Sequence, residues 1–308
     1  MVKYSFVLPA YKVHFFKEAI DSILTQTYKD FELIIVNDAS PENLGSIVKQ
    51  YDDPRIRYYV NEKNIGGKDL VAQWNHCLEY ALGDYVILAS DDDVYHPEYL
   101  EKMDVLVDKY PEVNVFRPRI QRINNKGDII HIESYTKEYT TCLEFAYAWT
   151  NGYIRSGIPF YLFKKDALKE IGGFVNFPLA WYSDDATVLS LIENGIAISS
   201  EILFSFRHSG ESISTHRNDS NTLKQKLNAT DIFYKWYDGF LKKIVTRNHY
   251  EKFYKQSIIQ RLETDKRGMQ IWCTENSSFR AILSNCSRLL KQEIVSFIYL
   301  IRLLLSRL

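Results

Sequence analysis

The sequence predicts an α/β protein: a mostly parallel, Rossmann-like sheet with helices on both faces, followed by a mostly helical C-terminal region. Short, continuous apolar runs such as YSFVLP, FELIIVND and DYVILAS recur in the first half of the chain. Such runs are typical of parallel strands that are buried on both faces. Amphipathic stretches such as KDLVAQWNHCLEYAL separate them, and from about residue 220 helical patterns replace the strand patterns.

The elements are expected to alternate regularly through the first half. The expected strands cover residues 4–9, 31–38, 55–61 and 84–90, and the expected helices cover residues 15–26, 41–51, 68–82 and 96–106. Further on, we expect strands within 112–135 around the turn NNKGD, a helix over 142–149, a strand over 158–163, a short helix ending at Gly172, a helix over 186–195 and a strand pair over 196–206. We place the start of the helical region, 218–308, after residue 217.

The composition and charge of the chain indicate which binding partners and which cellular location to expect. The chain has 308 residues, of which 46% are hydrophobic, and its formal net charge is -1, which gives no reason to expect nucleic-acid binding. The four cysteines form no CxxC pair, which favours reduced thiols in a cytosolic protein. The opening MVKYSFVLPAYKV is interrupted by Pro9 and Lys12, so it predicts a core strand of a cytoplasmic protein rather than a signal peptide.

Turn-forming or polar residues follow four of the predicted strands. They are Pro9 and Tyr11, then Asp38, then residues 61–67, and then Asp91, Asp92 and Asp93. In open α/β sheets, ligands bind beyond the carboxyl ends of the strands. One such aspartate is commonly a turn or cap residue, and this is the favoured interpretation of Asp38 taken alone. The recurrence at neighbouring strand ends favours a ligand site.

The three consecutive aspartates, 91–93, indicate a divalent cation. Mg²⁺ and Mn²⁺ prefer carboxylate oxygens, and Mg²⁺ is typically held by one or two carboxylates together with substrate phosphates. The alternative is that one aspartate caps the next helix, whose first turn also suits Pro97. Because capping explains one aspartate and not three, we expect a metal–diphosphate bridge here.

Several motifs in a fixed order resemble those of the inverting family-2 glycosyltransferases of the GT-A fold, of the bacterial cell-surface polysaccharide type. The motifs are SFVLPAYKVHFFKEAIDSILTQTYKDFELIIVNDAS, NIGG, WNHCLEYALGDYVILASDDDVYHPEYL, GGF and WYSDDATVLSLIENG, and the resemblance extends to about residue 215. It implies a GT-A catalytic domain over residues 1–217, with a donor-binding half at about 1–95 and an acceptor half at about 96–217. Two residues depart from the family pattern: Lys12 replaces a frequent Asn, and Ser90 replaces the first acidic residue of the metal motif.

The resemblance implies that the co-substrate is a nucleotide-diphospho-sugar, and we expect a UDP-sugar. Tyr11, next to Pro9, is expected to pack on the nucleobase, and Asp38 is expected to accept the imino hydrogen of the base. Backbone amides around Asn64 and Gly66, with Lys68, are expected near the ribose or phosphates, because glycine permits close approach. A simple strand-to-helix turn is the alternative for NIGG.

The cofactor implied by the resemblance is Mn²⁺ or Mg²⁺, acting as a Lewis acid on the leaving diphosphate. Either Asp91 and Asp93 form the metal-binding pair, or Asp92 is the main ligand, and both possibilities stay open. In FSFRHSGESISTH, Arg207 and His208 are expected to contact the diphosphate or the metal. A structural role is the alternative for His208, and His216 is a weaker candidate.

A second acidic pair, Asp184 and Asp185, falls where the family keeps its base. An adjacent carboxylate raises a carboxyl pKa, so we expect Asp185 to be the general base and Asp184 to support the acceptor or the fold. Helix capping is the alternative for either residue. Trp181 is expected to stack on an acceptor sugar, with a position in the core as the alternative. A base that serves the acceptor directly implies a single displacement with inversion.

The expected acceptor is a saccharide or a lipid-linked saccharide in surface polysaccharide synthesis. The second candidate enzyme is a sugar nucleotidylyltransferase, which would need a Gly- and Arg-rich phosphate loop that LPAYKVHFF lacks. A metal-dependent phosphohydrolase ranks third because no nucleophile stands out. A non-catalytic GT-A-like scaffold subunit is the non-enzymatic alternative.

The C-terminal EIVSFIYLIRLLLSRL falls short of the roughly 20 apolar residues that a spanning helix needs. Two interpretations stay open. The helix lies in a membrane interface, with Lys291, Arg302 and Arg307 near the lipid head groups, or it packs on the catalytic domain or on another subunit. The expected location is the cytoplasm, with peripheral contact at the inner face of the cell membrane under the first interpretation.

Overall fold

The computed structural model describes residues 2–210 and 217–306, and the chain divides into two compact units. The first unit comprises the residues up to Asn176 together with Ser183–Ser209. The second comprises Phe177–Tyr182 together with the helical region that follows residue 209. Two residues with expected roles, His216 and Arg307, lie outside the described residues.

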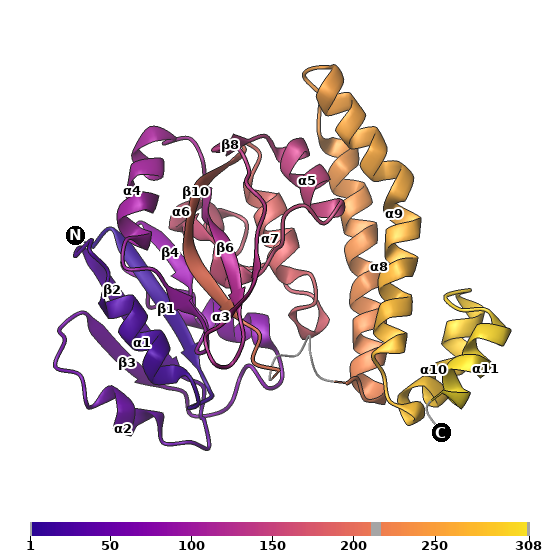
Figure 1. Ribbon diagram of the computed structural model, residues 1–308, viewed down its shortest axis with the longest axis horizontal. Coiled ribbons are helices and arrows are strands. Elements are labelled where there is room, and N and C mark those ends of the chain that lie inside the picture. The colour runs from indigo at the N-terminus through magenta and orange to yellow at the C-terminus, as the bar shows by residue number, and fades with distance from the viewer. Residues whose placement is uncertain (1, 211–216, 307–308) are drawn as a thin grey trace. The chain divides into compact units, whose positions relative to one another are not determined.

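Within the described residues, the strands of the first unit form one ten-stranded sheet (Figure 1). The strands are β1 (Tyr4–Ala10), β2 (Phe31–Asn37), β3 (Ile56–Val60), β4 (Tyr85–Leu88), β5 (Val94–Tyr95), β6 (Val115–Ile123), β7 (Ile129–Ile132), β8 (Tyr139–Thr140), β9 (Leu162–Lys164) and β10 (Ile196–Arg207). Their order is β3-β2-β1-β4-β9-β6-β10-β5, with β7 paired to β6 and β8 paired to β10.

Most of the paired length of the sheet is parallel, which confirms the predicted fold class. Strand β1 pairs in parallel with β2 and β4, and β6 pairs in parallel with β10. Strand β9 runs antiparallel between β4 and β6 and joins the two parallel parts. Every residue of β2 and β4 is buried. Because successive side chains of a strand point to opposite faces, both faces of the sheet are covered there.

Helices connect these strands in the first unit. They are α1 (Phe16–Leu24), α2 (Leu44–Val48), α3 (Leu70–Leu78), α4 (Tyr99–Lys109), α5 (Cys142–Thr150), α6 (Lys165–Glu170), α7 (Ser183–Leu191) and the short 3-10 helix η1 (Ile158–Phe160). Side-chain caps explain where two of them begin. Asp69 accepts a hydrogen bond from the backbone N–H of Ala72, and Thr141 and Glu144 form a capping box.

The structure differs from the expected elements in three places. The strand pair expected over 196–206 is one long strand, β10, whose register against β6 shifts between Ser199 and Phe204. The strand expected over 158–163 starts as η1, because Pro159 lacks the N–H that a central strand needs, and only Leu162–Lys164 form a strand. The apolar C-terminal stretch is helical only over Phe297–Leu305 within the described residues.

The second unit is helical. It contains the 3-10 helix η2 (Pro178–Ala180) and the helices α8 (Ser220–Lys243), α9 (His249–Glu275), α10 (Phe279–Lys291) and α11 (Phe297–Leu305). The two long helices, α8 and α9, lie side by side (Figure 1). Apolar residues of α8, α9 and α10 form its buried core, which includes Leu223, Leu227, Cys273, Ile282 and Leu289.

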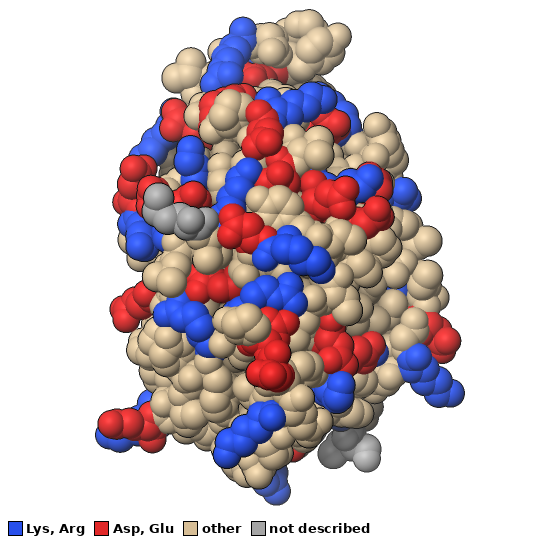
Figure 2. Space-filling view, turned by 90° about the vertical axis from the view of Figure 1, so that its left-hand side faces the viewer, with Lys and Arg blue, Asp and Glu red and all other residues tan. Residues whose placement is uncertain are grey.

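The surface carries charges of both signs. On the face drawn in Figure 2, acidic and basic side chains are interspersed. Helix α11 exposes four large apolar side chains: Phe297, Ile298, Ile301 and Leu305. Among residues 2–210 and 217–306, no helix is long and apolar enough to cross a membrane.

Candidate active site

Asp38 lies at the carboxyl end of β2 and holds the loop that follows β3. It is buried, and its backbone N–H donates to the carbonyl of Ala10 at 3.0 Å. Its Oδ1 accepts hydrogen bonds from Asn61 Nδ2 and from the backbone N–H of Ile65, each at 2.8 Å. Its Oδ2 accepts one from the backbone N–H of Gly66 at 2.7 Å. Through its backbone N–H and its carboxylate together, Asp38 therefore joins the ends of β1, β2 and β3, and its expected contact with a nucleobase stays a prediction.

The NIGG loop passes so close to this carboxylate that position 66 has no room for a side chain. A Cβ on Gly66 would lie 2.9 Å from Asp38 Oδ2. Asn64 supports the loop, because its Oδ1 accepts a hydrogen bond from the backbone N–H of Gly67 at 2.5 Å. Lys68 is exposed, and its ammonium makes no hydrogen bond to the described residues. An exposed ammonium beside backbone amides suits an anion.

Asp91 connects the end of β4 to the residues that follow β1. Its Oδ2 accepts hydrogen bonds from the backbone N–H groups of Tyr11 at 3.0 Å and Lys12 at 2.9 Å. Burial raises the pKa of the Asp91 carboxyl, and these two N–H groups oppose the rise. The Tyr11 side chain is 41% exposed and so can meet a ligand, while Pro9 is half-buried in β1 opposite Val36.

Asp92 and Asp93 are attached to the end of β10. Asp93 is fully buried, and its Oδ1 accepts a hydrogen bond from the backbone N–H of Arg207 at 2.8 Å. Its Oδ2 has no hydrogen-bond partner among the described residues. Burial, and then the charge of Asp92, raises the pKa of Asp93 well above its ordinary value. Asp92 is half-buried and accepts hydrogen bonds from Ser90 Oγ at 2.5 Å and Ser209 Oγ at 3.1 Å.

Arg207 is a buried support of this aspartate turn. Its Nε donates to the carbonyl of Asp92 at 2.8 Å, and its Nη1 donates to the carbonyl of Asn124 at 3.2 Å. Its Nη2 pairs with the Glu18 carboxylate at 2.7 Å, and its guanidinium lies 4.1 Å from the centre of the Phe15 ring. With the side chain only 1% exposed, these contacts occupy the group that was expected to bind a diphosphate. Its direct contact with a diphosphate stays a prediction.

The oxygen ligands for a metal ion are present, but they do not form a complete site. In the described part of the chain, no group of three His, Cys, Asp or Glu side chains is arranged to hold a metal by itself. Asp91 and Asp92 are half-buried carboxylates at the strand ends, and Asp93 has one unbonded oxygen. This set fits Mg²⁺ or Mn²⁺ when substrate phosphates and water complete the coordination shell. His208 is exposed, with its Nδ1 3.2 Å from Arg122 Nη2.

The acidic pair Asp184 and Asp185 lies in the first turn of α7. The backbone N–H of Asp185 donates to Asp184 Oδ1 at 3.0 Å. The side chains of Ser156 and Trp149 lie beside the Asp185 carboxylate as hydrogen-bonding groups that lower its pKa, and its Oδ1 has no partner among the described residues. Burial, and then the charge of Asp184, raises the pKa of Asp185 well above its ordinary value, and burial also raises the pKa of Asp184. A raised pKa suits a general base.

The backbone directly before this pair is strained. Leu179, Ala180 and Tyr182 have φ angles of 60°, 56° and 72°, a region that residues other than glycine rarely enter. Such strain persists only where the surroundings hold it, and it clusters at functional sites. Within the second unit, the Tyr182 ring stacks on Phe233 with centroids 4.1 Å apart.

Trp181 belongs to the same segment and packs against the core of the helical unit. Its ring stacks on Trp272 with centroids 6.0 Å apart, and Lys226 Nζ lies 4.4 Å from the ring centre. These contacts match the core position that was the alternative for this residue. Its stacking on an acceptor sugar stays a prediction.

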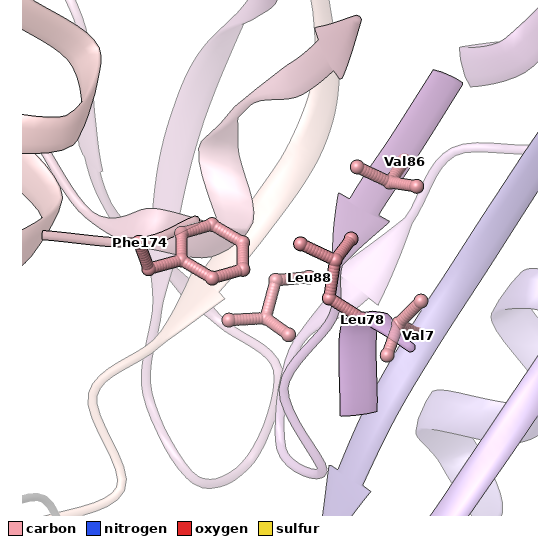
Figure 3. Close-up of a pocket in the computed structure, with 5 residues that line it drawn as sticks. All are labelled: Val7, Leu78, Val86, Leu88 and Phe174. Atoms are coloured by element: carbon pink, nitrogen blue, oxygen red, sulfur yellow. The ribbon is translucent and has the colours of Figure 1, made fainter. Parts of the chain in front are cut away.

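The pocket drawn in Figure 3 offers no polar group to a nucleotide sugar. Its lining is apolar and consists of Val7, Leu78, Val86, Leu88 and Phe174. Phe174 ends the GGF motif, and Asn75 of α3 holds it: Asn75 Oδ1 accepts from the Phe174 N–H at 2.7 Å, and Asn75 Nδ2 donates to the Phe174 carbonyl at 3.2 Å. Gly173 has φ +91°, and a Cβ there would lie 2.3 Å from Asn75 Oδ1. The motif therefore attaches the acceptor half to α3.

A family model described as Glycosyl transferase family 2 matches residues 5–172, which is more than half of the chain. This chain belongs to glycosyl transferase family 2. The match includes Asp38 and the three aspartates and stops before Asp184 and Asp185.

Relatives of this family 2 chain among curated proteins carry glycosyltransferase names. One of them, EpsE of Bacillus subtilis (strain 168), is 41% identical over 101 residues, which is 32% of this chain and 35% of EpsE. The uncharacterized glycosyltransferase RT0329 of Rickettsia typhi is 27% identical over 248 residues, which is 78% of this chain and 72% of that protein. The chain thus aligns with about a third of EpsE and with most of RT0329.

Solved structures share the fold of this family 2 chain. S. aureus TarS 1-349 in complex with UDP-GlcNAc matches with a TM-score of 0.66 at 15% identity, over 91% of this chain and 83% of that chain. The mannosyltransferase PcManGT from Pyrobaculum calidifontis, in complex with GDP-Man and Mn²⁺, matches with a TM-score of 0.54 at 13% identity, over 92% and 75% of the two chains. This likeness is one of fold, the GT-A fold.

Sequence reasoning did not identify three groups of this family 2 site: Ser156 and Trp149, which touch Asp185, and Glu18, which pairs with Arg207. Ser156 and Trp149 lie outside the motifs that indicated the site, and Glu18 lies in the first of them at a position that was assigned no role. Each comes next to an aspartate or to Arg207 only through folding. A single sequence therefore carries no local signal for them.

Proposed function

We propose that this chain is a metal-dependent, inverting glycosyltransferase that moves a sugar from a UDP-sugar to a saccharide or lipid-linked acceptor in surface polysaccharide synthesis. The observation that carries the proposal is the way in which Asp38 and Asp91 join four strand ends. Asp38 binds the loop after β3 and the end of β1, and Asp91 binds the residues after β1 from the end of β4. In α/β sheets this edge is where ligands bind.

The similar solved structures support a nucleotide-sugar co-substrate, since one is a complex with UDP-GlcNAc and another a complex with GDP-Man and Mn²⁺. We prefer uridine because the TarS complex has the higher TM-score of the two. In our proposal the exposed Tyr11 ring packs on the base, with Pro9 beside it, and Asp38 accepts the imino hydrogen. Lys68 and the amides near Asn64 and Gly66 meet the ribose or the phosphates.

The metal ligands in this proposal are Asp91 and Asp92, with the unbonded Oδ2 of Asp93 as a third available oxygen. A bound Mn²⁺ or Mg²⁺ supplies charge neutralisation for the leaving diphosphate. Asp93 and Arg207 hold the turn that carries the ligands through the bonds between them. His208, which follows the buried Arg207 and is exposed, is assigned to the diphosphate or the metal.

Asp185 takes the proton of the acceptor hydroxyl in this proposal. Its raised pKa makes it a stronger base than an ordinary carboxylate, and its Oδ1 is unbonded among the described residues. Burial, and then the charge of Asp184, keeps that pKa high, and Trp181 is proposed to contact the acceptor. Because one base serves the acceptor directly, the anomeric configuration inverts.

We further propose a cytoplasmic location with peripheral contact at the inner face of the cell membrane. The exposed apolar residues of α11 support it, with Arg302 and Lys291 near the head groups. Self-association through the same helix is the alternative. Binding to anionic vesicles by a protein that sediments as a monomer favours the membrane, and a concentration-dependent dimer without vesicle binding favours self-association.

Calorimetric titration of UDP with and without Mn²⁺ tests the proposed site. We expect binding that depends on Mn²⁺ and is lost in Asp92→Ala, with Asp91→Ala and Asp93→Ala measured beside it. Absence of UDP binding under both conditions would remove the preferred donor class, and GDP would be titrated next. A protein that binds UDP and Mn²⁺ but transfers no sugar from any UDP-sugar to water or acceptor would favour the scaffold alternative.

A further inference from the structure

A buried ion pair in the first unit holds the backbone of the loop that contains Arg155 and Ser156. Arg117 of β6 and Glu133 are both buried, and Arg117 Nη2 donates to Glu133 Oε2 at 2.7 Å. Glu133 Oε1 accepts from the backbone N–H of Arg155 at 3.0 Å. Arg117 Nη1 donates to the carbonyl of the same Arg155 at 2.8 Å. The pair therefore binds both backbone polar groups of the residue directly before Ser156.

Ser156 links this pair to the proposed base. Its side chain lies beside the Asp185 carboxylate and, as a hydrogen-bonding group, lowers the pKa of that carboxyl, and its Oγ accepts a hydrogen bond from Tyr161 Oη at 3.1 Å. A serine hydroxyl carries one proton, and because Tyr161 donates to its oxygen, that proton is available for Asp185. Tyr161 is fully buried, and the Arg117 guanidinium lies 5.5 Å from the centre of its ring.

One oxygen of Asp185 is left for a substrate proton. Its Oδ1 has no hydrogen-bond partner among the described residues, while Ser156 and Trp149 are the hydrogen-bonding side chains beside the carboxylate. A base contributes fully only when it is held in line with the proton that it takes.

Protein stability alone does not explain why Arg117 and Glu133 form a buried ion pair. Replacement of a buried ion pair by apolar groups of similar volume is often neutral or stabilising, so such a pair is weak evidence for a role in stability. Arg117 Nε donates to the carbonyl of Pro118 at 3.2 Å, and the other two hydrogen bonds of the pair go to one loop residue, Arg155. This arrangement favours a role in placing the loop that carries Ser156.

We propose that Arg117, Glu133 and Tyr161 are positioning residues that act through Ser156 to orient the Asp185 carboxylate toward the acceptor hydroxyl. The inference rests on the proposed function, in which Asp185 is the base. Because hydrogen bonds to a carboxylate favour its charged form, loss of the Ser156 hydroxyl raises the pKa of Asp185 further. The other groups that face Asp185 are Asp184 on α7 and Trp149 on α5, and Tyr161 lies behind Ser156.

Two single variants, Ser156→Ala and Tyr161→Phe, test the link. The matched control is Tyr99→Phe, which removes the hydroxyl of another fully buried tyrosine, one that has no hydrogen-bond partner among the described residues. The titration midpoint of Asp185, followed by carboxyl ¹³C NMR and assigned with Asp185→Asn, is expected to rise in both variants and to stay unchanged in the control. We expect kcat to fall by about tenfold in Ser156→Ala and by less in Tyr161→Phe, part of the ~10²–10⁴-fold that a positioned base contributes. The KM for the sugar donor is expected to stay unchanged.

The double variant Arg117→Met/Glu133→Leu tests the ion pair without leaving one buried charge unpaired. With the fold retained by circular dichroism, we expect the same rise of the Asp185 midpoint and the same loss of kcat as in Ser156→Ala. Unchanged midpoints and pH profiles in the folded variants would overturn the inference. A wild-type protein without transferase activity would contradict the proposed function instead, and the NMR midpoints would still decide whether these residues act on Asp185.

Discussion

The backbone N–H of Arg207 donates to Asp93 Oδ1 at 2.8 Å, although 114 positions separate the two residues in the sequence. The Arg207 guanidinium adds a bond to the carbonyl of Asp92 and an ion pair with Glu18. The end of β10 is therefore the support on which the aspartate turn is built. Arg207 thereby fixes the backbone at Asp92 and one carboxylate oxygen of Asp93.

Replacing Arg207 by Met should destabilise the protein and weaken its metal-dependent nucleotide binding. The substitution removes buried hydrogen bonds and an ion pair, and we expect the free energy of unfolding to fall by about 3 kcal/mol. Urea unfolding and UDP titration with Mn²⁺ measure the two effects. Arg280→Met, at an exposed position, controls for the loss of a positive charge. An Arg207→Met protein with unchanged stability and UDP affinity would show that the turn does not depend on this residue.

Gly66→Ala should weaken nucleotide binding, because the added Cβ would lie 2.9 Å from Asp38 Oδ2 and would displace the loop. We expect UDP affinity to fall by about tenfold, which corresponds to ~1.4 kcal/mol. The matched control is Gly239→Ala in α8, where a Cβ meets no atom within 4 Å and where alanine favours the helix. Equal UDP affinities in the two variants would contradict a role for the NIGG loop in binding.

The acidic pair makes both stability and activity depend on pH. Because the pKa values of Asp184 and Asp185 are raised in the folded protein, the folded state binds protons more tightly than the unfolded state. Stability contributed by the pair is therefore present at low pH and is lost as the pH rises from about 3.9, the ordinary carboxyl pKa, toward the raised values. Activity changes in the opposite direction, since Asp185 must be ionised to act as a base.

Asp185→Asn separates these two effects. We expect a higher Tm than that of the wild type near pH 8, a smaller difference near pH 4, and a loss of kcat of about 10²-fold or more. Asp30→Asn, at an exposed position, controls for the loss of one charge. Thermal unfolding and initial rates between pH 4 and pH 8 provide the measurement. A variant with wild-type kcat would exclude Asp185 as the base.

The strained backbone before Asp184 predicts that two substitutions of Ala180 affect the stability of the protein differently. Ala180 has φ 56°, which glycine adopts freely, so Ala180→Gly should leave the Tm unchanged or raise it. Ala180→Val should lose about 1–2 kcal/mol, because a β-branched residue is strongly disfavoured at positive φ. If the glycine variant also has a lower kcat, the strain contributes to placing the acidic pair. Two variants of equal Tm would show that the left-handed conformation is absent in solution.

The β-strands of the first half were predictable because their signal is local. Continuous apolar runs mark β1, β2 and β4, and the expected ranges overlap the observed strands. The form of the stretches at 158–163 and 196–206 was not predictable in the same way. The η1 turn at Pro159 and the register shift in β10 depend on the strands that pair with them.

The α/β class, the alternation of strands and helices in the first half, and the position of Asp38 and the three aspartates at strand ends all follow from local sequence patterns, since apolar periodicity and turn residues act over short stretches. Which groups meet depends on the fold. It buried Arg207 under the aspartate turn, brought Ser156 to Asp185 and packed Trp181 against the core of the helical unit. Such contacts join residues far apart in the chain, and they depend on strand register and on burial. Local composition and periodicity do not encode either of these.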